Sequence, residues 1–90
     1  MMGNEFVALI DVVPDDTDVN FEEFIEQIKG VLSDECTLEA HEILPVAFGL
    51  KKARIRVRYP DEWGGTDKIE EMLAKLDNVQ GIEAIAFSKA

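Results

Sequence analysis

The sequence predicts an α+β domain, with a four-stranded antiparallel sheet and two helices on one face of that sheet. Three observations lead to this fold class. The chain has 90 residues, which is the size of one domain over residues 1–90. Two stretches carry apolar residues at helical spacing. Four other stretches are rich in apolar and β-branched residues and are bounded by turn residues, so that the chain order is strand, helix, strand, strand, helix, strand.

The first part of the chain predicts a strand and then a helix. Residues 5–13 are apolar on both faces and end at Pro14, which is typical of a central strand. A run of turn residues then leads to Asn20, which forms a capping-box pattern with Glu23 three positions later. A helix from residue 20 to about residue 31 is predicted by apolar residues at intervals of three and four: Phe21, Phe24, Ile25, Ile28, Val31 and Leu32.

The middle of the chain predicts a pair of strands joined by a turn. Residues 37–44 form a moderately apolar strand. Pro45 has no N–H group to donate to a sheet, so this strand is expected at an edge or next to a bulge. Phe48 and Gly49 form the turn. Residues 50–59 then alternate and predict a half-buried strand, with Ala53, Ile55, Val57 and Tyr59 on one side and Arg54, Arg56 and Arg58 on the other.

The last part of the chain predicts a second helix and a fourth strand. Thr66 or Asp67 caps the helix, and Asp67 begins a second capping-box pattern. The helix buries Ile69, Met72, Leu73 and Leu76 and has Lys75 in its last turn. Residues 82–87 form the final strand, and residues 88–90 are a short tail. The βαββαβ order is the ferredoxin-like arrangement, which leaves one face of the sheet partly open for the arginines.

The charge of the chain restricts its partners. Lys and Arg number 9 against 19 Asp and Glu, a net charge of −10. Most of this surface would repel nucleic acid, so no direct nucleic-acid partner is expected. Yet most of the positive charge falls on one short run: Lys51, Lys52, Arg54, Arg56 and Arg58. An electropositive protein partner fits the overall charge, with the basic run set against a local acidic patch.

Other features bear on the location of the protein. No apolar run approaches the roughly 18–20 residues of a membrane span, so no membrane partner is expected. The N-terminus lacks the pattern of a secretory signal. The single cysteine, Cys36, cannot form an internal disulfide and is most simply a small residue in a reducing compartment. These features together predict a cytoplasmic protein.

The patterns that enzymes and metal sites use are absent from the sequence. A calcium-binding loop that starts at Asp16 would have Phe21 where a glycine is required and Gln27 where a glutamate is required. There is no glycine-rich phosphate loop, no cysteine pair for zinc and no acid–base pair around the single histidine. The sequence therefore predicts no catalytic residue, no metal site and no cofactor.

Four segments resemble a known family: DVVPDDTDVN, PVAFGLKKARI, PDEWGGT and VQGIEAIAFSKA. They are similar to the elongation factor 1-beta exchange-factor family in its short archaeal form, and PVAFGLKK and AFSK are the most specific of them. The resemblance covers nearly the whole chain and implies the same βαββαβ fold. It also implies a translation factor that promotes exchange of GDP for GTP on the elongation factor 1-alpha GTPase, without covalent chemistry.

The resemblance also implies roles for particular residues. In the family, the penultimate lysine is inserted toward the magnesium and phosphate end of the nucleotide site of the GTPase, where it displaces Mg²⁺ and loosens the phosphate site. By motif this lysine is Lys89. The aromatic residue of the PxxFG segment also contacts the GTPase, and by motif it is Phe48. A large aliphatic residue usually follows the lysine, whereas here it is Ala90. The implied partner-binding residues are Phe48, Gly49, Leu50, Lys51, Phe87, Ser88 and Lys89.

The residues alone leave several alternatives open. Phe48 is either an anchor at an interface or part of the core. The arginines either contact a partner or pair with the acidic residues of the chain itself. Trp63 is either an exposed contact or a lid over the core. The fold also suits an RNA-binding module, although arginines stand where that module has stacking aromatics, or a small ligand-sensing domain.

Overall fold

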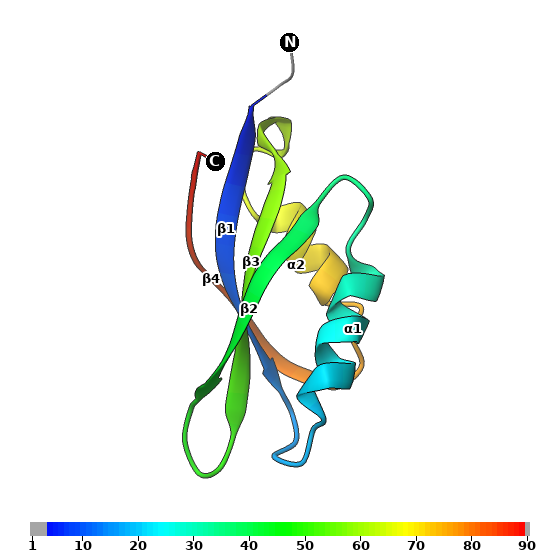
Figure 1. Cartoon of the computed structure of the whole chain (residues 1–90), viewed down its shortest axis with the longest axis vertical. Helices are drawn as coiled ribbons and strands as arrows, with labels where there is room; N and C mark the ends of the chain where they lie inside the picture. The colour runs from blue at the N-terminus through cyan, green and yellow to red at the C-terminus, as the bar shows by residue number, and fades with distance from the viewer. Residues whose placement is uncertain (1–3, 90) are drawn as a thin grey trace.

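A computed structural model describes residues 4–89 of the chain. Figure 1 shows a four-stranded antiparallel sheet with both helices on the same side of it. The strand order is β2-β3-β1-β4, which confirms the ferredoxin-like prediction. The elements are β1 (Glu5–Pro14), α1 (Phe21–Val31), β2 (Thr37–Pro45), β3 (Lys51–Pro60), the 3₁₀ helix η1 (Asp61–Trp63), α2 (Asp67–Leu73) and β4 (Val79–Lys89). Within residues 4–89, neither helix is long and apolar enough to cross a membrane.

β1 is a central strand, as its two apolar faces predict. It pairs with β3 on one side and with β4 on the other. Ala8, Ile10 and Val12 are fully buried in the core on the helix-bearing face. On the open face, Val7 and Asp11 are also buried although no helix covers them. A buried carboxylate at this position needs cations close by, since an unpaired charge is costly to bury.

α1 begins where the capping pattern predicts. The side-chain oxygen of Asn20 accepts hydrogen bonds from the backbone N–H groups of Glu22 (3.0 Å) and Glu23 (3.2 Å). A cap of this kind contributes about 1 kcal/mol to helix stability. The apolar stripe read from the sequence is the face that closes the core, where α1 buries Phe24, Ile25 and Ile28.

β3 has the alternation that the sequence predicts, with four fully buried residues, Ala53, Ile55, Val57 and Tyr59. β2 is an edge strand, as predicted, because it pairs with β3 alone. Its register shift is not at Pro45 but between Leu38 and Ala40, which leaves Glu39 as an extra residue. This bulge places the Glu39 carboxylate between two arginines of β3 on the open face.

α2 is shorter than predicted. It ends at Leu73, so Lys75 lies beyond the helix and not in its last turn. Thr66 occupies the N-cap position, and the predicted capping box at Asp67 is wrong. The Thr66 hydroxyl donates to the Glu70 carboxylate (2.6 Å) and makes no hydrogen bond to the helix backbone. With no side-chain cap, this short helix depends on the burial of its apolar face.

β4 is longer than the predicted span of residues 82–87. Its ends pair with β1, so that Val79 lies opposite Pro14 and Lys89 lies opposite Phe6. Sheet pairing extends the strand through residues that carry no strong strand signal of their own. The predicted tail is therefore wrong for residues 88 and 89, which belong to the sheet. Ala90 lies outside the described residues.

Two residues of β4 are out of step with β1, Gln80 near the start of the strand and Ile85 in its second half. The successive residues Leu9 and Ile10 pair with Ala86 and Ala84, so Ile85 is an extra residue in the manner of a β-bulge. The bulge reverses the alternation of everything that follows it along the strand. Beyond it, Ala86 and Ser88 lie on the open face, and Phe87 and Lys89 lie on the helix-bearing face.

Candidate functional site

The residues assigned to partner binding fall at opposite ends of the sheet. Residues 48–51 lie at the turn between β2 and β3, at the bottom of Figure 1, and residues 87–89 end β4 near the top. β3 runs between the two ends, since Lys51 pairs beside the turn and Tyr59 pairs with Phe6, the residue opposite Lys89. At about 3.3 Å per residue this strand spans roughly 25 Å. The structure therefore divides the predicted residues between two separate candidate sites.

The first site is the hairpin turn, which carries Phe48 into solvent. The Leu50 N–H donates to the Ala47 carbonyl (2.9 Å), and the two central residues, Phe48 and Gly49, have φ of +53° and +80°. Positive φ at both central positions is the mark of a type I′ turn, which favours Asn and Gly. For a residue with a Cβ, this left-handed backbone conformation costs about 1–2 kcal/mol. The Phe48 side chain is fully exposed, so it is not part of the core and nothing in the fold explains its presence.

The second site is the end of β4, which is tied to the core by a row of aromatic rings. The Phe87 ring is half exposed and lies 5.7 Å from the Phe6 ring, which in turn lies 5.8 Å from the ring of buried Tyr59. Lys89 is exposed and has no ion pair with any of residues 4–89. The last described residue of the chain is therefore an uncompensated cation on a strand that the sheet holds in place.

Two residues of the basic run, Lys52 and Arg54, pair with one buried carboxylate of the fold. Asp11 is 1% exposed and accepts hydrogen bonds from Nε (2.8 Å) and Nη2 (3.1 Å) of Arg54, and it pairs with Nζ of Lys52 (2.7 Å). The hydrogen bond from Arg54 is the main reason why the pKa of Asp11 lies below its usual value, against the opposing effect of burial. Lys52 and Arg54 are thus committed to an internal carboxylate.

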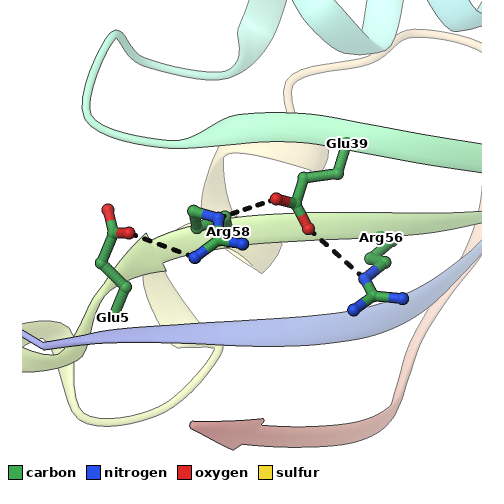
Figure 2. Close-up of polar contacts among 4 residues, drawn as sticks. All are labelled: Glu5, Glu39, Arg56 and Arg58. Carbon is green, nitrogen blue, oxygen red and sulfur yellow. Dashed lines mark hydrogen bonds and ion pairs between the residues drawn. The ribbon is translucent and has the colours of Figure 1, made fainter. Parts of the chain in front are cut away.

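The second half of the run forms a chain of ion pairs on the open face (Figure 2). Glu5 Oε1 lies 3.3 Å from Nη1 of Arg58, whose Nε donates to Glu39 Oε2 at 2.7 Å. The other oxygen of Glu39 lies 3.3 Å from Nε of Arg56. Pairs at a surface each contribute at most about 1 kcal/mol, so their main effect is to fix side-chain positions. Arg54, Arg56 and Arg58 therefore each have an acidic partner within the chain itself.

Two other candidate side chains are structural. Trp63 stacks on Tyr59 with ring centres 6.0 Å apart and packs against the core, and the ammonium group of Lys68 lies 5.3 Å from the centre of its ring. Trp63 is thus the lid of the core. Cys36 is buried, and burial raises the pKa of its thiol, which disfavours the reactive thiolate. Among residues 4–89, no group of three or more His, Cys, Asp or Glu side chains could hold a metal ion.

The sequence alone did not identify the three carboxylates that pair with the basic run, Asp11, Glu39 and Glu5. Asp11 carried a usable signal, because a lone acid within an apolar strand needs a cation beside it. Glu39 carried none, since its position depends on a bulge. Two exposed apolar residues near the two sites, Val46 and Ile85, were also missed.

Comparison with known proteins indicates one family. The family model of the EF-1 guanine nucleotide exchange domain matches residues 7–90. Among curated relatives, elongation factor 1-beta of Hyperthermus butylicus is 36% identical over 87% of this chain and 86% of its own length. The protein of the same name from Ignicoccus hospitalis is 40% identical over 80% and 78%, respectively. That of Thermococcus onnurineus is 32% identical over 99% of both chains.

Solved structures agree on the fold. The crystal structure of the ACT domain from GTP pyrophosphokinase of Chlorobium tepidum has a TM-score of 0.57 and covers 90% of this chain and 99% of its own. The solution structure of the same domain has the same TM-score and covers 91% and 88%. The sequences are only 22% and 21% identical to this one, so the likeness concerns the backbone arrangement alone.

Proposed function

Because the chain belongs to the EF-1 guanine nucleotide exchange domain family, we propose that it promotes exchange of GDP for GTP on elongation factor 1-alpha in the cytoplasm. Residues 1–90 act as a single exchange domain, and Lys89 is the residue that perturbs the nucleotide site. The observation that carries this proposal is the setting of Lys89, an exposed cation that has no ion pair with any of residues 4–89 and lies on a strand paired to the centre of the sheet.

The physical basis is the response of a bound nucleotide to a new positive charge. GDP is held through its phosphates by Mg²⁺ and the phosphate loop of the GTPase. A lysine inserted beside them repels Mg²⁺ and competes for its anionic ligands. Two unit charges about 8 Å apart interact with about 2 kcal/mol at the effective dielectric constant of a protein surface. No covalent intermediate is needed, and the exchange factor itself requires no cofactor.

Exchange also requires that the factor binds the nucleotide-free GTPase more tightly than the loaded form. By linkage, the factor then weakens nucleotide binding by the same ratio. The pairing of Lys89 with Phe6 supports tight binding to the nucleotide-free GTPase. A lysine on a sheet strand loses less conformational entropy on insertion than a lysine on a free tail. The half-exposed Phe87 ring beside it supplies apolar contact area.

The hairpin turn is the second contact. Phe48 is a fully exposed aromatic in a strained turn, which is the setting of an interface anchor and not of a structural residue. Gly49, Leu50 and Lys51 adjoin it. Since the two sites lie roughly 25 Å apart, they contact separate areas of the GTPase. The turn contributes affinity, and the end of β4 contributes the change at the nucleotide site.

Release of a fluorescent GDP analogue from elongation factor 1-alpha tests this proposal. Lys89→Ala is expected to lower the maximal release rate by at least about tenfold, as the loss of about 2 kcal/mol allows. Lys75→Ala is the matched control, because it removes another exposed lysine, in the turn between α2 and β4. Circular dichroism checks that both variants fold. Equal rates for the two variants, or no acceleration by the unmodified chain, would refute the proposal.

A further inference from the structure

A groove of about 360 Å³ lies on the open face of the sheet, directly beside the end of β4. Val7, Leu9 and Ala86 provide apolar surface along it, and Arg56 and Arg58 line it as well. Ser88 and Lys89 border it, so the groove is continuous with the tip that the proposed function places against the GTPase. It therefore combines apolar surface with guanidinium groups at the edge of an expected interface.

The two arginines of the groove differ in how far they are engaged. Arg58 binds Glu39 at 2.7 Å and Glu5 at 3.3 Å. Arg56 has a single ion pair, from its Nε to Glu39 at 3.3 Å, and donates no hydrogen bond to any of residues 4–89. Its side chain is 56% exposed. The two terminal nitrogens of Arg56 are thus available to a ligand.

The ion-pair chain in Figure 2 orients this free group. Its charges alternate, from Glu5 through Arg58 and Glu39 to Arg56, and the cationic end lies at the groove. The Glu39 side chain is 26% exposed and makes a short contact to Arg58, and its other oxygen lies 3.3 Å from Nε of Arg56, which favours one orientation of that guanidinium. A guanidinium held by Nε presents its two terminal nitrogens as a fork that matches a carboxylate.

We propose that this groove binds an acidic side chain on an extended segment of elongation factor 1-alpha, with Arg56 holding the carboxylate and the apolar surface taking the neighbouring apolar residue. This inference rests on the proposed function and adds a specificity-determining contact to it. A protein segment is favoured over nucleic acid for two reasons. The groove has apolar surface beside its cations, which suits a peptide segment that carries both an apolar and an acidic side chain, and the net charge of −10 repels a polyanion but tolerates one carboxylate.

The test separates binding from the exchange step. GDP release from elongation factor 1-alpha is measured over a range of concentrations of the unmodified chain and of Arg56→Ala, Arg56→Lys and Lys75→Ala. Arg56→Ala is expected to raise the half-saturating concentration by roughly tenfold, the size of one charge-assisted hydrogen-bonded pair, with the maximal rate unchanged. Arg56→Lys keeps the charge but loses the fork, so it should recover only part of the affinity. Lys75→Ala should stay within about twofold of the unmodified chain.

The outcomes distinguish this inference from the proposed function. If the unmodified chain accelerates release and Arg56→Ala binds like Lys75→Ala, the groove contact is overturned while the exchange activity stands. If the unmodified chain does not accelerate release, the proposed function fails. Binding of a single-stranded RNA oligonucleotide that Arg56→Ala abolishes would overturn the protein segment as the occupant.

Discussion

Replacing Phe48 by asparagine should make the domain more stable and at the same time a weaker partner for the GTPase. Phe48 has a φ of +53° and its side chain is fully exposed. The substitution therefore removes no buried surface from the fold. It also relieves most of the strain of about 1–2 kcal/mol that a left-handed backbone conformation imposes on residues other than Gly, Asn and Asp. Asparagine followed by glycine is also the preferred pair of a type I′ turn.

The expected gain is about 1 kcal/mol in the free energy of unfolding. For a domain of this size that corresponds to a rise in Tm of about 4–8 °C. Urea unfolding followed by circular dichroism measures the free energy, and a thermal melt gives Tm. Phe48→Ala is the matched control, because it removes the ring but keeps an ordinary residue in the left-handed conformation. Its stability should stay within about 0.5 kcal/mol of the unmodified chain.

Binding then separates the two roles of the residue. Both variants lack the ring, so both should bind nucleotide-free elongation factor 1-alpha more weakly, by roughly tenfold or more if Phe48 is an interface anchor. A Phe48→Asn variant that is less stable than the unmodified chain would refute the reasoning, because it would mean that the ring contributes to the fold. Unchanged binding by both variants would remove Phe48 from the interface.

Two further predictions concern stability. Asp11 has a pKa below its usual 3.8 in the folded state, so its pairing with Lys52 and Arg54 stabilises the fold above about pH 4, and this stabilisation is lost as the pH falls through the folded-state pKa. Thermal melts from about pH 2 to pH 6 should show a smaller acid-induced fall in Tm for Asp11→Asn than for the unmodified chain; parallel curves would contradict this. Gly49→Ala should lower the free energy of unfolding, measured in urea, by about 1 kcal/mol, because Gly49 has a φ of +80°. The nearest atom to an added Cβ, Cγ2 of Thr17, is 4.0 Å away, so backbone strain and not a clash causes the effect. A loss several times larger would point to a clash instead.

The sequence predicts best those features that depend on local pattern. The alternation from Ala53 to Tyr59 gave the buried and exposed sides of β3, and Asn20 gave the start of α1. Both are decided by neighbours a few residues away. The ends of α2 and β4 were predicted less well, because they depend on partners distant in the chain. Lys89 belongs to β4 since Phe6 lies opposite it, and nothing within residues 88–90 indicates that pairing.

The candidate site divides in the same way. The turn at Phe48 was recognised from its glycine, but exposure of the ring follows from the backbone conformation at the tip of the hairpin. The basic run was visible in the sequence, whereas its counterions were not. Glu39 reaches Arg56 and Arg58 because of a bulge in β2, and bulges have no dependable sequence signal.

The extra residue Ile85 decides on which face of the sheet the side chain of Lys89 lies. Side chains of a strand alternate with a period of two, so a single added residue exchanges the two sides for everything downstream. Without this residue, the Lys89 side chain would lie on the open face with Arg56 and Arg58, where like charges repel. The irregularity in β4 therefore works as a phase shift, which places Ser88 opposite Val7 on the open face and Lys89 opposite Phe6 on the helix-bearing face.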